Sequence, residues 1–322
     1  MRMSWPTRVI DRESSWAVLV GASEYLSSTL EAIPQAETSV ADLQRALTGP
    51  RGLFRDERVV TVTNPKSAED ILGPLDQIAG QQPDVVLFYY VGHGMQESLD
   101  GGGRGLMELF LTLHGSVDDG ADRIRTGVPV NSVFSRLRSL RANQPVVVLD
   151  CCFAGRALED RSAGDIHVLC ATGKTTRARY ALTDRHTGFT GALLQLFEQG
   201  VPDGPRHIDL NTVFHRLSVI LPTTTAAGSG KLLPKPRQRT TDHSGSLALV
   251  RNPAFGTAHT PEGMAARAEF ARRVADRGGV QTLPAGEQRM LLAHATELFE
   301  SLATDSMKPT PPPGEHNSAS AP

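Results

Sequence analysis

A histidine and a cysteine in this sequence stand at positions where an enzyme could use them together. His93 ends an apolar run, residues 85–91, and lies between Gly92 and Gly94. Cys152 follows a second apolar run, residues 145–150. A histidine next to a thiol can take up its proton and so produce a nucleophile for acyl transfer. The two residues predict a thiol-dependent site, provided that the fold brings the ends of these runs together.

The elements around these residues predict an α/β protein. Short apolar runs alternate with helix-like stretches, and continuous apolar strands of this kind are typical of a sheet covered on both faces. We expect a mostly parallel six-stranded sheet sandwiched by helices. The strands are expected at residues 16–22, 58–63, 84–91, 145–150, 166–172 and 246–250, and the helices at 37–49, 67–80 (capped by Ser67 and broken near Gly73–Pro74), 130–141, 188–200 and 210–221.

Such a sheet would place the histidine and the cysteine at its catalytic edge. The carboxyl ends of parallel strands are where α/β folds carry their chemistry. If the strands before His93 and Cys152 are neighbours, the two side chains face one crevice. A helix starting after Cys152 would favour its thiolate through the N-terminal dipole. Gly92 and Gly94 would let the backbone approach a substrate and help to hold an oxyanion.

The stretches "YYVGHG" (89–94) and "LDCCFAG" (149–155) resemble the caspase and metacaspase clan of cysteine peptidases. That family carries a histidine between glycines after the third strand and Asp-x-Cys-x-x-Gly after the fourth. The caspase histidine precedes its cysteine by roughly 50 residues, a separation close to the present one. "WAVLVGASEY" (16–25), "HTGFTGALLQLFEQG" (186–200) and residues 233–253 are similar to further segments of bacterial caspase-like proteins, in a branch associated with conflict and defence operons.

The resemblance implies a caspase-like fold and a role for each matching residue. Cys152 matches the nucleophile and His93 the base, and Gly94 and the Cys152 backbone match the oxyanion hole. Asp150 falls where metacaspases have an acidic residue of the S1 pocket. A carboxylate there recognises Arg or Lys, and the arginines with which caspases hold a P1 aspartate are not evident. The implied activity is a cysteine endopeptidase that cleaves after Arg or Lys.

Val91, Phe153 and Ala154 differ from the family pattern but leave the histidine and the cysteine in place. We expect Cys151 and Cys170 to be buried, inert thiols. Adjacent cysteines lack zinc-ligand spacing, so no metal site is expected there.

Two loops and one further segment add candidates of lower specificity. Asp100, soon after the base, could add a second substrate-binding carboxylate to an S1 pocket. Residues 118–122 contain three aspartates, which in some metacaspases would suggest calcium, although the spacing of a calcium loop is absent. Otherwise no cofactor is expected. Arg156 and Arg161 follow the nucleophile and are candidate self-processing sites.

Composition describes an ordinary globular protein. The 322 residues carry a formal charge of −2, and 21% of them are charged, which gives no reason to expect nucleic acid or a membrane as a partner. Three cysteines, two of them adjacent, suit a reducing cytoplasm.

The domain boundaries follow from a change in character near residue 253. We assign residues 1–253 to the peptidase domain, 254–305 to a helical extension and 306–322 to a disordered tail rich in Pro and Ser. Helices are expected at 260–279, capped by Thr260, and at 285–303. The extension could pack on its own domain or dock an operon-encoded partner.

Two function classes remain open at this stage. The first is a cysteine endopeptidase that acts on an unidentified protein substrate in defence or regulated proteolysis. The alternative is a catalytically weak scaffold or signalling module of the same fold that acts by docking partners. A nucleotide-binding protein is disfavoured because "VGASEY" (20–25) lacks a phosphate-cradling glycine pattern.

Overall fold

A six-stranded sheet forms the centre of the computed structural model, which describes residues 7–98, 107–176, 184–226, 230–241 and 243–276. Five neighbouring strands run parallel and the sixth, at one edge, runs antiparallel to its neighbour. The expected mostly parallel six-stranded sheet is thus confirmed. Its order is β11 (Arg237–Arg239), β9 (His167–Cys170), β8 (Gln144–Asp150), β4 (Val85–Val91), β2 (Trp16–Gly21) and β3 (Val59–Thr63).

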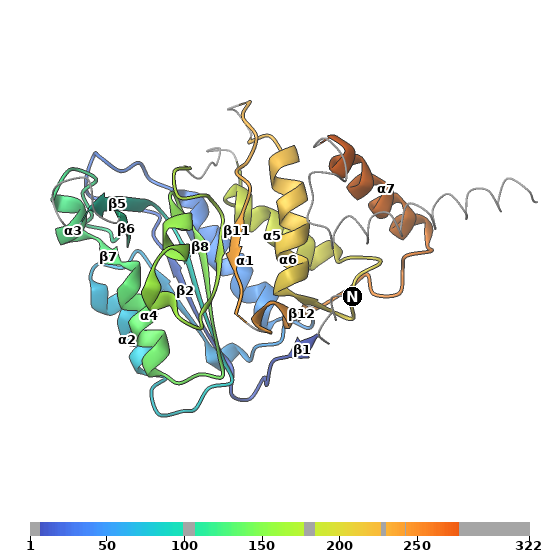
Figure 1. The fold of residues 1–322 in the computed structure, drawn as a ribbon, viewed down its shortest axis with the longest axis horizontal. Helices are drawn as coiled ribbons and strands as arrows, with labels where there is room; N and C mark the ends of the chain where they lie inside the picture. The colour runs from blue at the N-terminus through green and yellow to red at the C-terminus, as the bar shows by residue number, and fades with distance from the viewer. Residues whose placement is uncertain (1–6, 99–106, 177–183, 227–229, 242, 277–322) are drawn as a thin grey trace, which may run out of the picture. The chain divides into compact units, whose positions relative to one another are not determined.

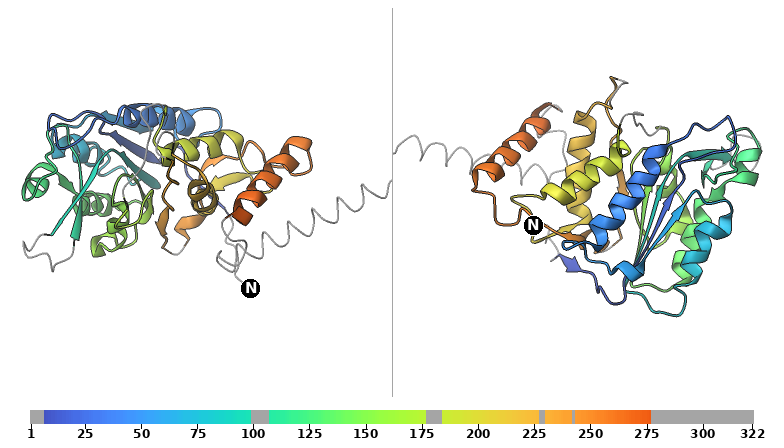
Figure 2. Two further views of the ribbon diagram at one scale, coloured as in Figure 1. Left: turned by 90° about the horizontal axis from the view of Figure 1, so that it is seen from above. Right: turned by 180° about the vertical axis from the view of Figure 1, so that it is seen from behind.

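Helices cover both faces of this sheet, as Figures 1 and 2 show. On one face lie α1 (Pro34–Thr48), α5 (Gly188–Gln199) and α6 (Leu210–Ile220), which share one apolar core with the sheet. On the other face lie α2 (Ala68–Asp76) and α4 (Val130–Ser139), which share a second core. The central strand β4 is buried along its whole length, so its residues alternate between the two cores. This explains its unbroken apolar sequence.

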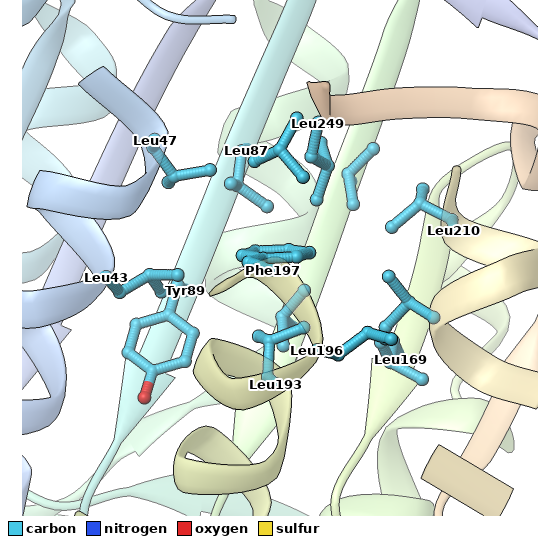
Figure 3. Packing of buried hydrophobic residues seen from close by; sticks show 14 of the residues in the cluster. Leu43, Leu47, Leu87, Tyr89, Leu169, Leu193, Leu196, Phe197, Leu210 and Leu249 are labelled. Carbon is cyan, nitrogen blue, oxygen red and sulfur yellow. The ribbon is translucent and has the colours of Figure 1, made fainter. Parts of the chain in front are cut away.

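The core on the α1 and α5 side is built from large side chains of both layers (Figure 3). Phe197, Leu193 and Leu196 of α5 pack among Leu87 and Tyr89 of β4 and are at most 5% exposed. Full burial of a side chain of this size stabilises the folded state by about 1.5–3 kcal/mol. The packing fixes α5 against the sheet, and the start of α5 is one of the segments that build the site described below.

The sixth strand of the central sheet is not the apolar run expected at 246–250. That run forms β12 (Leu247–Arg251), which pairs with β1 (Arg8–Val9) and β10 (His207–Asp209) in a separate sheet. The edge position is taken instead by β11, "RQR", a polar segment that the sequence does not mark as a strand. Polar side chains are tolerated at a sheet edge because one side of such a strand remains open to solvent.

A third sheet lies directly after His93 and was not expected from the sequence. It consists of β5 (Gly94–Ser98), β6 (Met107–Leu111) and β7 (Val128–Pro129), with α3 (Asp122–Thr126) just before β7. The Gly- and Asp-rich composition of this region predicts loops, but the last three residues of β6 are buried. Short 3-10 helices complete the described elements: η1 (Asp56–Arg58), η2 (Ala154–Leu158), η3 (Arg161–Ala163), η4 (Leu221–Thr223) and η5 (Ser244–Ser246).

The helix ends largely follow the sequence signals. Ser67 caps α2 in a capping box: its hydroxyl accepts from the Asp70 amide, and the Asp70 carboxylate accepts from the Ser67 amide. The expected break at Gly73–Pro74 is wrong, because α2 continues through Pro74 to Asp76. Pro74 costs the helix one backbone hydrogen bond, the one to the Asp70 carbonyl, because proline has no N–H to donate.

After β12 the chain forms α7 (Pro261–Asp276), and the Thr260 hydroxyl accepts from the Gly263 amide at its start. The helix contacts α6, where the Arg216 guanidinium lies 4.0 Å from the centroid of the Phe270 ring. The helix expected at 285–303 and the tail after it lie outside the described residues, so the domain boundaries stay a prediction. None of the helices in the described part of the chain combines the length and apolarity needed to cross a membrane.

Candidate active site

His93 and Cys152 come from neighbouring strands of the central sheet. β4 and β8 pair in parallel, with Val91 opposite Asp150. His93 and Cys152 each lie two residues beyond this pair, at the same edge of the sheet. The Gly94 backbone touches the cysteine turn: a Cβ on Gly94 would lie 2.2 Å from the Cys152 carbonyl oxygen. The condition that the sequence set for a joint site, adjacency of the two strands, is therefore met.

The His93 ring is held by the loop that follows β2. Its Nε2 lies 2.8 Å from the Glu31 carbonyl oxygen. A carbonyl can only accept a hydrogen bond, so Nε2 carries the proton and Nδ1 is the basic nitrogen of the neutral ring. The Tyr25 ring lies against the imidazole, with 5.0 Å between the ring centroids. The sequence gives no signal for the Glu31 contact, because any residue can provide a carbonyl.

The backbone of His93 is fixed as firmly as its ring. Its amide donates to the Tyr25 hydroxyl over 3.1 Å. Its carbonyl accepts from the hydroxyls of Tyr90 (2.9 Å) and Thr112 (3.1 Å). A Cβ at Gly92 would lie 2.7 Å from the Tyr90 hydroxyl oxygen. Gly92 therefore makes room for the protein's own hydroxyl, whereas the sequence interpretation assigned the glycines to the approach of a substrate.

The turn after β8 presents Cys152 on a strained backbone. Phe153 has φ 59° and ψ 14°, a left-handed conformation that costs a residue other than glycine about 1–2 kcal/mol. Hydrogen bonds from the end of β9 hold this turn. The Thr172 hydroxyl donates to the Cys151 carbonyl (2.9 Å) and accepts from the Ala154 amide (3.1 Å), and the Phe153 amide donates to the Thr176 carbonyl (3.0 Å).

The α-helix expected directly after Cys152 is not formed. The segment is the five-residue 3-10 helix η2, and its first amides point at Thr172 and Thr176. Its short dipole is a weak source of thiolate stabilisation, which leaves that task to His93. The amides of Phe153 and Ala154 are also committed to these bonds and do not serve as oxyanion donors.

The Asp150 carboxylate is buried next to the cysteine, on the α5 side of the sheet. It is 3% exposed, and its Oδ2 accepts from the hydroxyls of Thr187 and of Thr190 (2.6 Å) at the start of α5. Burial raises the pKa of this carboxyl, while the two hydroxyl donors counteract the shift. Within the described residues no cationic side chain lies within ion-pair distance of Asp150.

The amino-acid sequence matches a known family. The model of the caspase domain matches residues 14–244, more than two thirds of the chain. The chain belongs to the caspase domain family. No curated protein sequence is significantly similar to it.

Solved structures show the same fold at low sequence identity. Caspase-1 from Spodoptera frugiperda is 13% identical, with a TM-score of 0.51, over 78% of this chain and 93% of that one. A protein from Geobacter sulfurreducens is 12% identical, with a TM-score of 0.50, over 75% and 98%. At these identities the likeness establishes the fold. The expected caspase-like fold is confirmed.

The three cysteines of the caspase domain differ sharply in accessibility. Cys151 and Cys170 are fully buried, whereas Cys152 is partly exposed. Burial raises the pKa of the Cys151 thiol well above its usual value, and the neighbouring Cys152 adds to that rise. A buried thiol that resists ionisation is a poor nucleophile. The interpretation of Cys151 and Cys170 as core thiols agrees with this placement.

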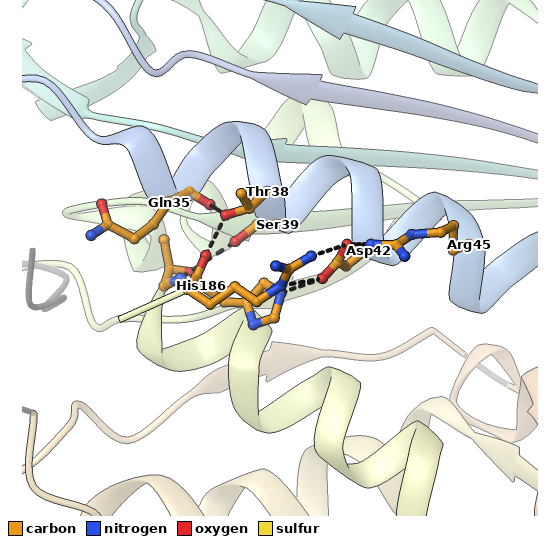
Figure 4. A network of polar contacts seen from close by, with 8 residues as sticks. Gln35, Thr38, Ser39, Asp42, Arg45 and His186 are labelled. Carbon is orange, nitrogen blue, oxygen red and sulfur yellow. Dashed lines mark hydrogen bonds and ion pairs between the residues drawn. The ribbon is translucent and has the colours of Figure 1, made fainter. Parts of the chain in front are cut away.

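The segment that leads into α5 is tied to α1 through Asp42, as Figure 4 shows. The Asp42 carboxylate accepts from Arg45, from Arg185 (2.9 and 3.3 Å) and from Nε2 of His186 (2.7 Å). Burial, followed by the nearby Arg185 and Arg45, lowers the pKa of His186. Beside this network a cavity of about 580 Å³ opens between α1 and α5, and neither His93 nor Cys152 lines it.

Several other candidates in the caspase domain are not brought together. Asp100 lies outside the described residues. Asp118 pairs with Arg123 (2.5 Å) and Asp122 with Arg125, so these carboxylates do not converge. The described part of the chain holds no cluster of three or more His, Cys, Asp or Glu side chains suited to a metal ion.

The candidate self-processing sites lie in folded turns. Arg156 belongs to η2, its side chain is 17% exposed, and it donates to Gln96 over 3.0 Å. Arg161 begins η3 and is exposed. A protease needs an extended segment, which these turns do not offer without local unfolding. Self-cleavage at either arginine stays a prediction.

Proposed function

We propose that this caspase domain is a cysteine endopeptidase that uses His93 as the base and Cys152 as the nucleophile. The observation that carries the proposal is the hydrogen bond from Nε2 of His93 to the Glu31 carbonyl. It leaves Nδ1 as the basic nitrogen of the imidazole, on the strand end next to the cysteine turn. The partial exposure of Cys152 beside two buried cysteines supports its choice as the nucleophile.

The reaction proceeds through an acyl-enzyme. Nδ1 of His93 takes the thiol proton, and the Cys152 sulfur attacks the carbonyl carbon of the peptide. The imidazolium then gives that proton to the leaving amine, and the acyl group remains on sulfur. Water, deprotonated by His93, attacks the thioester and frees the thiol. We assign the oxyanion to the amides of Gly94 and Cys152, which belong to two backbone segments in contact.

Asp150 is the proposed P1 determinant. Its carboxylate is buried and has no cationic partner among the described residues, which is costly, and a substrate Arg or Lys would supply that partner. Arg can bind a carboxylate in a bidentate manner. The proposed specificity is therefore cleavage after Arg or Lys, as in the metacaspases that the chain resembles. We further propose a cytoplasmic role in bacterial defence or regulated proteolysis, on the resemblance to that branch.

Three substitutions test the dyad. Cys152→Ala and His93→Ala are expected to abolish cleavage of fluorogenic peptides and, for Cys152→Ala, labelling by a thiol-reactive activity probe. Cys151→Ala serves as the matched control and should retain both activities. A Cys151→Ala protein that loses labelling while Cys152→Ala keeps it would overturn the assignment. Circular dichroism shows whether each variant is folded.

Peptides that differ only at P1 test the pocket. The wild type should prefer P1 Arg or Lys to P1 Asp, and Asp150→Asn should lose that preference by removing the charge at constant shape. Cleavage after Asp, or an unchanged Arg preference in Asp150→Asn, would contradict the proposed pocket.

A further inference from the structure

Asp42 lies on α1, outside the site described above, and binds the segment that leads into α5. Its carboxylate is 15% exposed and accepts from three donors. Arg45 belongs to α1 itself, but Arg185 and His186 belong to the segment of residues 185–187. The Arg45 and Arg185 side chains are 69% and 63% exposed, so the bond to the 19% exposed His186 is the one that is sheltered from water. Asp42 is thus suited to fixing the position of this segment.

The same helix contacts residues 185–187 at two further points (Figure 4). The Thr38 hydroxyl donates to the Arg185 carbonyl. The Thr187 amide donates to the Ser39 hydroxyl over 3.3 Å. One face of α1 therefore binds each of the three residues in the segment, through side chains and backbone. We call this set of contacts the α1 clamp.

The α1 clamp continues to the Asp150 carboxylate through one residue. Thr187 follows His186 in the sequence, and its hydroxyl donates to Oδ2 of Asp150. Thr190 donates to the same oxygen over 2.6 Å and is itself bonded to the Tyr89 hydroxyl. Tyr89 belongs to the rigid strand β4, so the Thr190 donor is fixed by the sheet. The Thr187 donor is held at two points: its amide donates to the Ser39 hydroxyl of α1, and its hydroxyl accepts from the Thr190 amide as the N-cap of α5.

We propose that Asp42 is a positioning residue for P1 specificity, because it holds residues 185–187 and thereby fixes the donor that orients the Asp150 carboxylate. This inference rests on the proposed function, in which Asp150 binds the P1 side chain. Charge-assisted recognition of a guanidinium depends on the direction of the carboxylate oxygens. Without the clamp, Thr187 keeps only its cap bond to α5, which lets its hydroxyl shift and the Asp150 carboxylate rotate. The turn that carries Cys152 and the His93 ring are held by other contacts and are unaffected.

The test removes single contacts of the α1 clamp with substitutions that change the size of the side chain as little as possible. Asp42→Asn keeps the volume and removes the charge, and Ser39→Ala removes a second clamp contact. Asp203→Asn is the matched control, since Asp203 is 10% exposed and paired with Arg216 (2.7 Å), far along the chain from the clamp. KM and kcat are measured for peptides with P1 Arg and P1 norleucine, together with the rate of Cys152 alkylation by iodoacetamide.

Asp42→Asn is expected to raise KM for the P1 Arg peptide roughly tenfold and leave the P1 norleucine peptide unchanged. Alkylation of Cys152 should keep its wild-type rate, which a role limited to global stability would not predict. Ser39→Ala should shift KM in the same direction. Equal losses on both peptides, slower alkylation, or the same KM change in Asp203→Asn would overturn the proposal. If Asp42→Asn does not fold, Ser39→Ala alone decides by the same criteria.

Binding separates this inference from the proposed function. A fluorescein-labelled P1 Arg peptide is titrated into Cys152→Ala, with and without Asp42→Asn, and followed by anisotropy. Weaker binding in the double variant supports the clamp even if the wild-type protein cleaves no peptide, in which case only the proposed function fails. If the wild type cleaves the peptide and Cys152→Ala binds it equally well with and without Asp42→Asn, the clamp proposal is wrong and the proposed peptidase function stands.

Discussion

At the scale of single residues, the buried imidazole of His167 links the stability of the protein to pH. The side chain is fully buried, and its Nδ1 lies 2.9 Å from the Ser244 hydroxyl. Nε2 has no hydrogen-bond partner among the described residues. Burial lowers the pKa of His167 to about 3, from 6.5. The folded protein therefore keeps this ring neutral under conditions in which the unfolded chain takes up a proton.

This difference predicts a loss of stability as pH falls. Above pH 6.5 both states hold the ring neutral and there is no effect. Between pH 6.5 and about 3 only the unfolded state takes up a proton at this ring. This lowers the free energy of unfolding by about 1.4 kcal/mol per pH unit, or roughly 2 kcal/mol at pH 5. Urea unfolding at pH 7.5 and 5.0 measures the effect. Between these two pH values, the free energy of unfolding should fall by about 2 kcal/mol less for His167→Gln than for the wild type. The exposed His259→Gln is the control. Equal losses in wild type and His167→Gln would refute the assignment.

Residue types point to the proposed dyad in the sequence but not to the groups that orient it. His93 and Cys152 could be named because each ends an apolar run and only a few side chains are effective bases and nucleophiles. The Glu31 carbonyl, which fixes the His93 tautomer, has no sequence signature. The Tyr25 and Thr112 hydroxyls also escape notice, since hydroxyls are common and their partners lie far along the chain.

At the scale of elements, the end of β9 shapes the nucleophile turn that follows β8. The Thr172 hydroxyl bonds to the Cys151 carbonyl and the Ala154 amide, which lie on either side of Cys152 and the strained Phe153. Without these bonds the turn can relax toward a less strained conformation and move the sulfur. A misplacement of about 1 Å can cost 10²-fold in rate.

Thr172→Val, which keeps the shape and removes both hydrogen bonds, is expected to lower kcat about 10- to 100-fold. Thr172→Ser should recover most of the activity because it retains the hydroxyl. Steady-state kinetics and the rate of Cys152 alkylation by iodoacetamide measure the effect. A Thr172→Val enzyme with wild-type kcat and alkylation would show that the turn holds its shape unaided.

The elements themselves were predictable where burial dictates the pattern. β4 and β8 read as strands because nearly every side chain is buried. The edge strand β11, "RQR", has no such pattern and exists only through its pairing with β9. The apolar β12 was recognised as a strand, but its sheet was not, because pairing partners depend on tertiary contacts. The 3-10 helix after Cys152 replaced the expected α-helix for the same reason: tertiary contacts to Thr172 and Thr176, in the segment after β9, use its first amides.

At the scale of the whole molecule, the proposed dyad and the C-terminal helix of the described chain occupy different parts of the fold. The proposed dyad lies where β4 and β8 end, whereas α7 packs on α6. There the Arg216 guanidinium is paired with Asp203 and covered by the Phe270 ring, and Val274 is 4% exposed. Packing of α7 thus shelters a charged group that would otherwise meet solvent.

We therefore expect a protein that ends at Gly256 to stay folded and keep its peptidase activity, with lower stability. Loss of the buried Val274 lowers the free energy of unfolding by about 1.5 kcal/mol or more. Loss of the Phe270–Arg216 contact lowers it further, by about 0.5–2 kcal/mol. For a unit of this size, each kcal/mol lowers Tm by about 2–4 °C. Calorimetry and kcat on a P1 Arg peptide measure both effects, and Phe270→Ala in the full chain should reproduce part of the shift in Tm. Insoluble truncated protein would show instead that α7 is required for folding of the core, while an unchanged Tm would show that its packing contributes nothing.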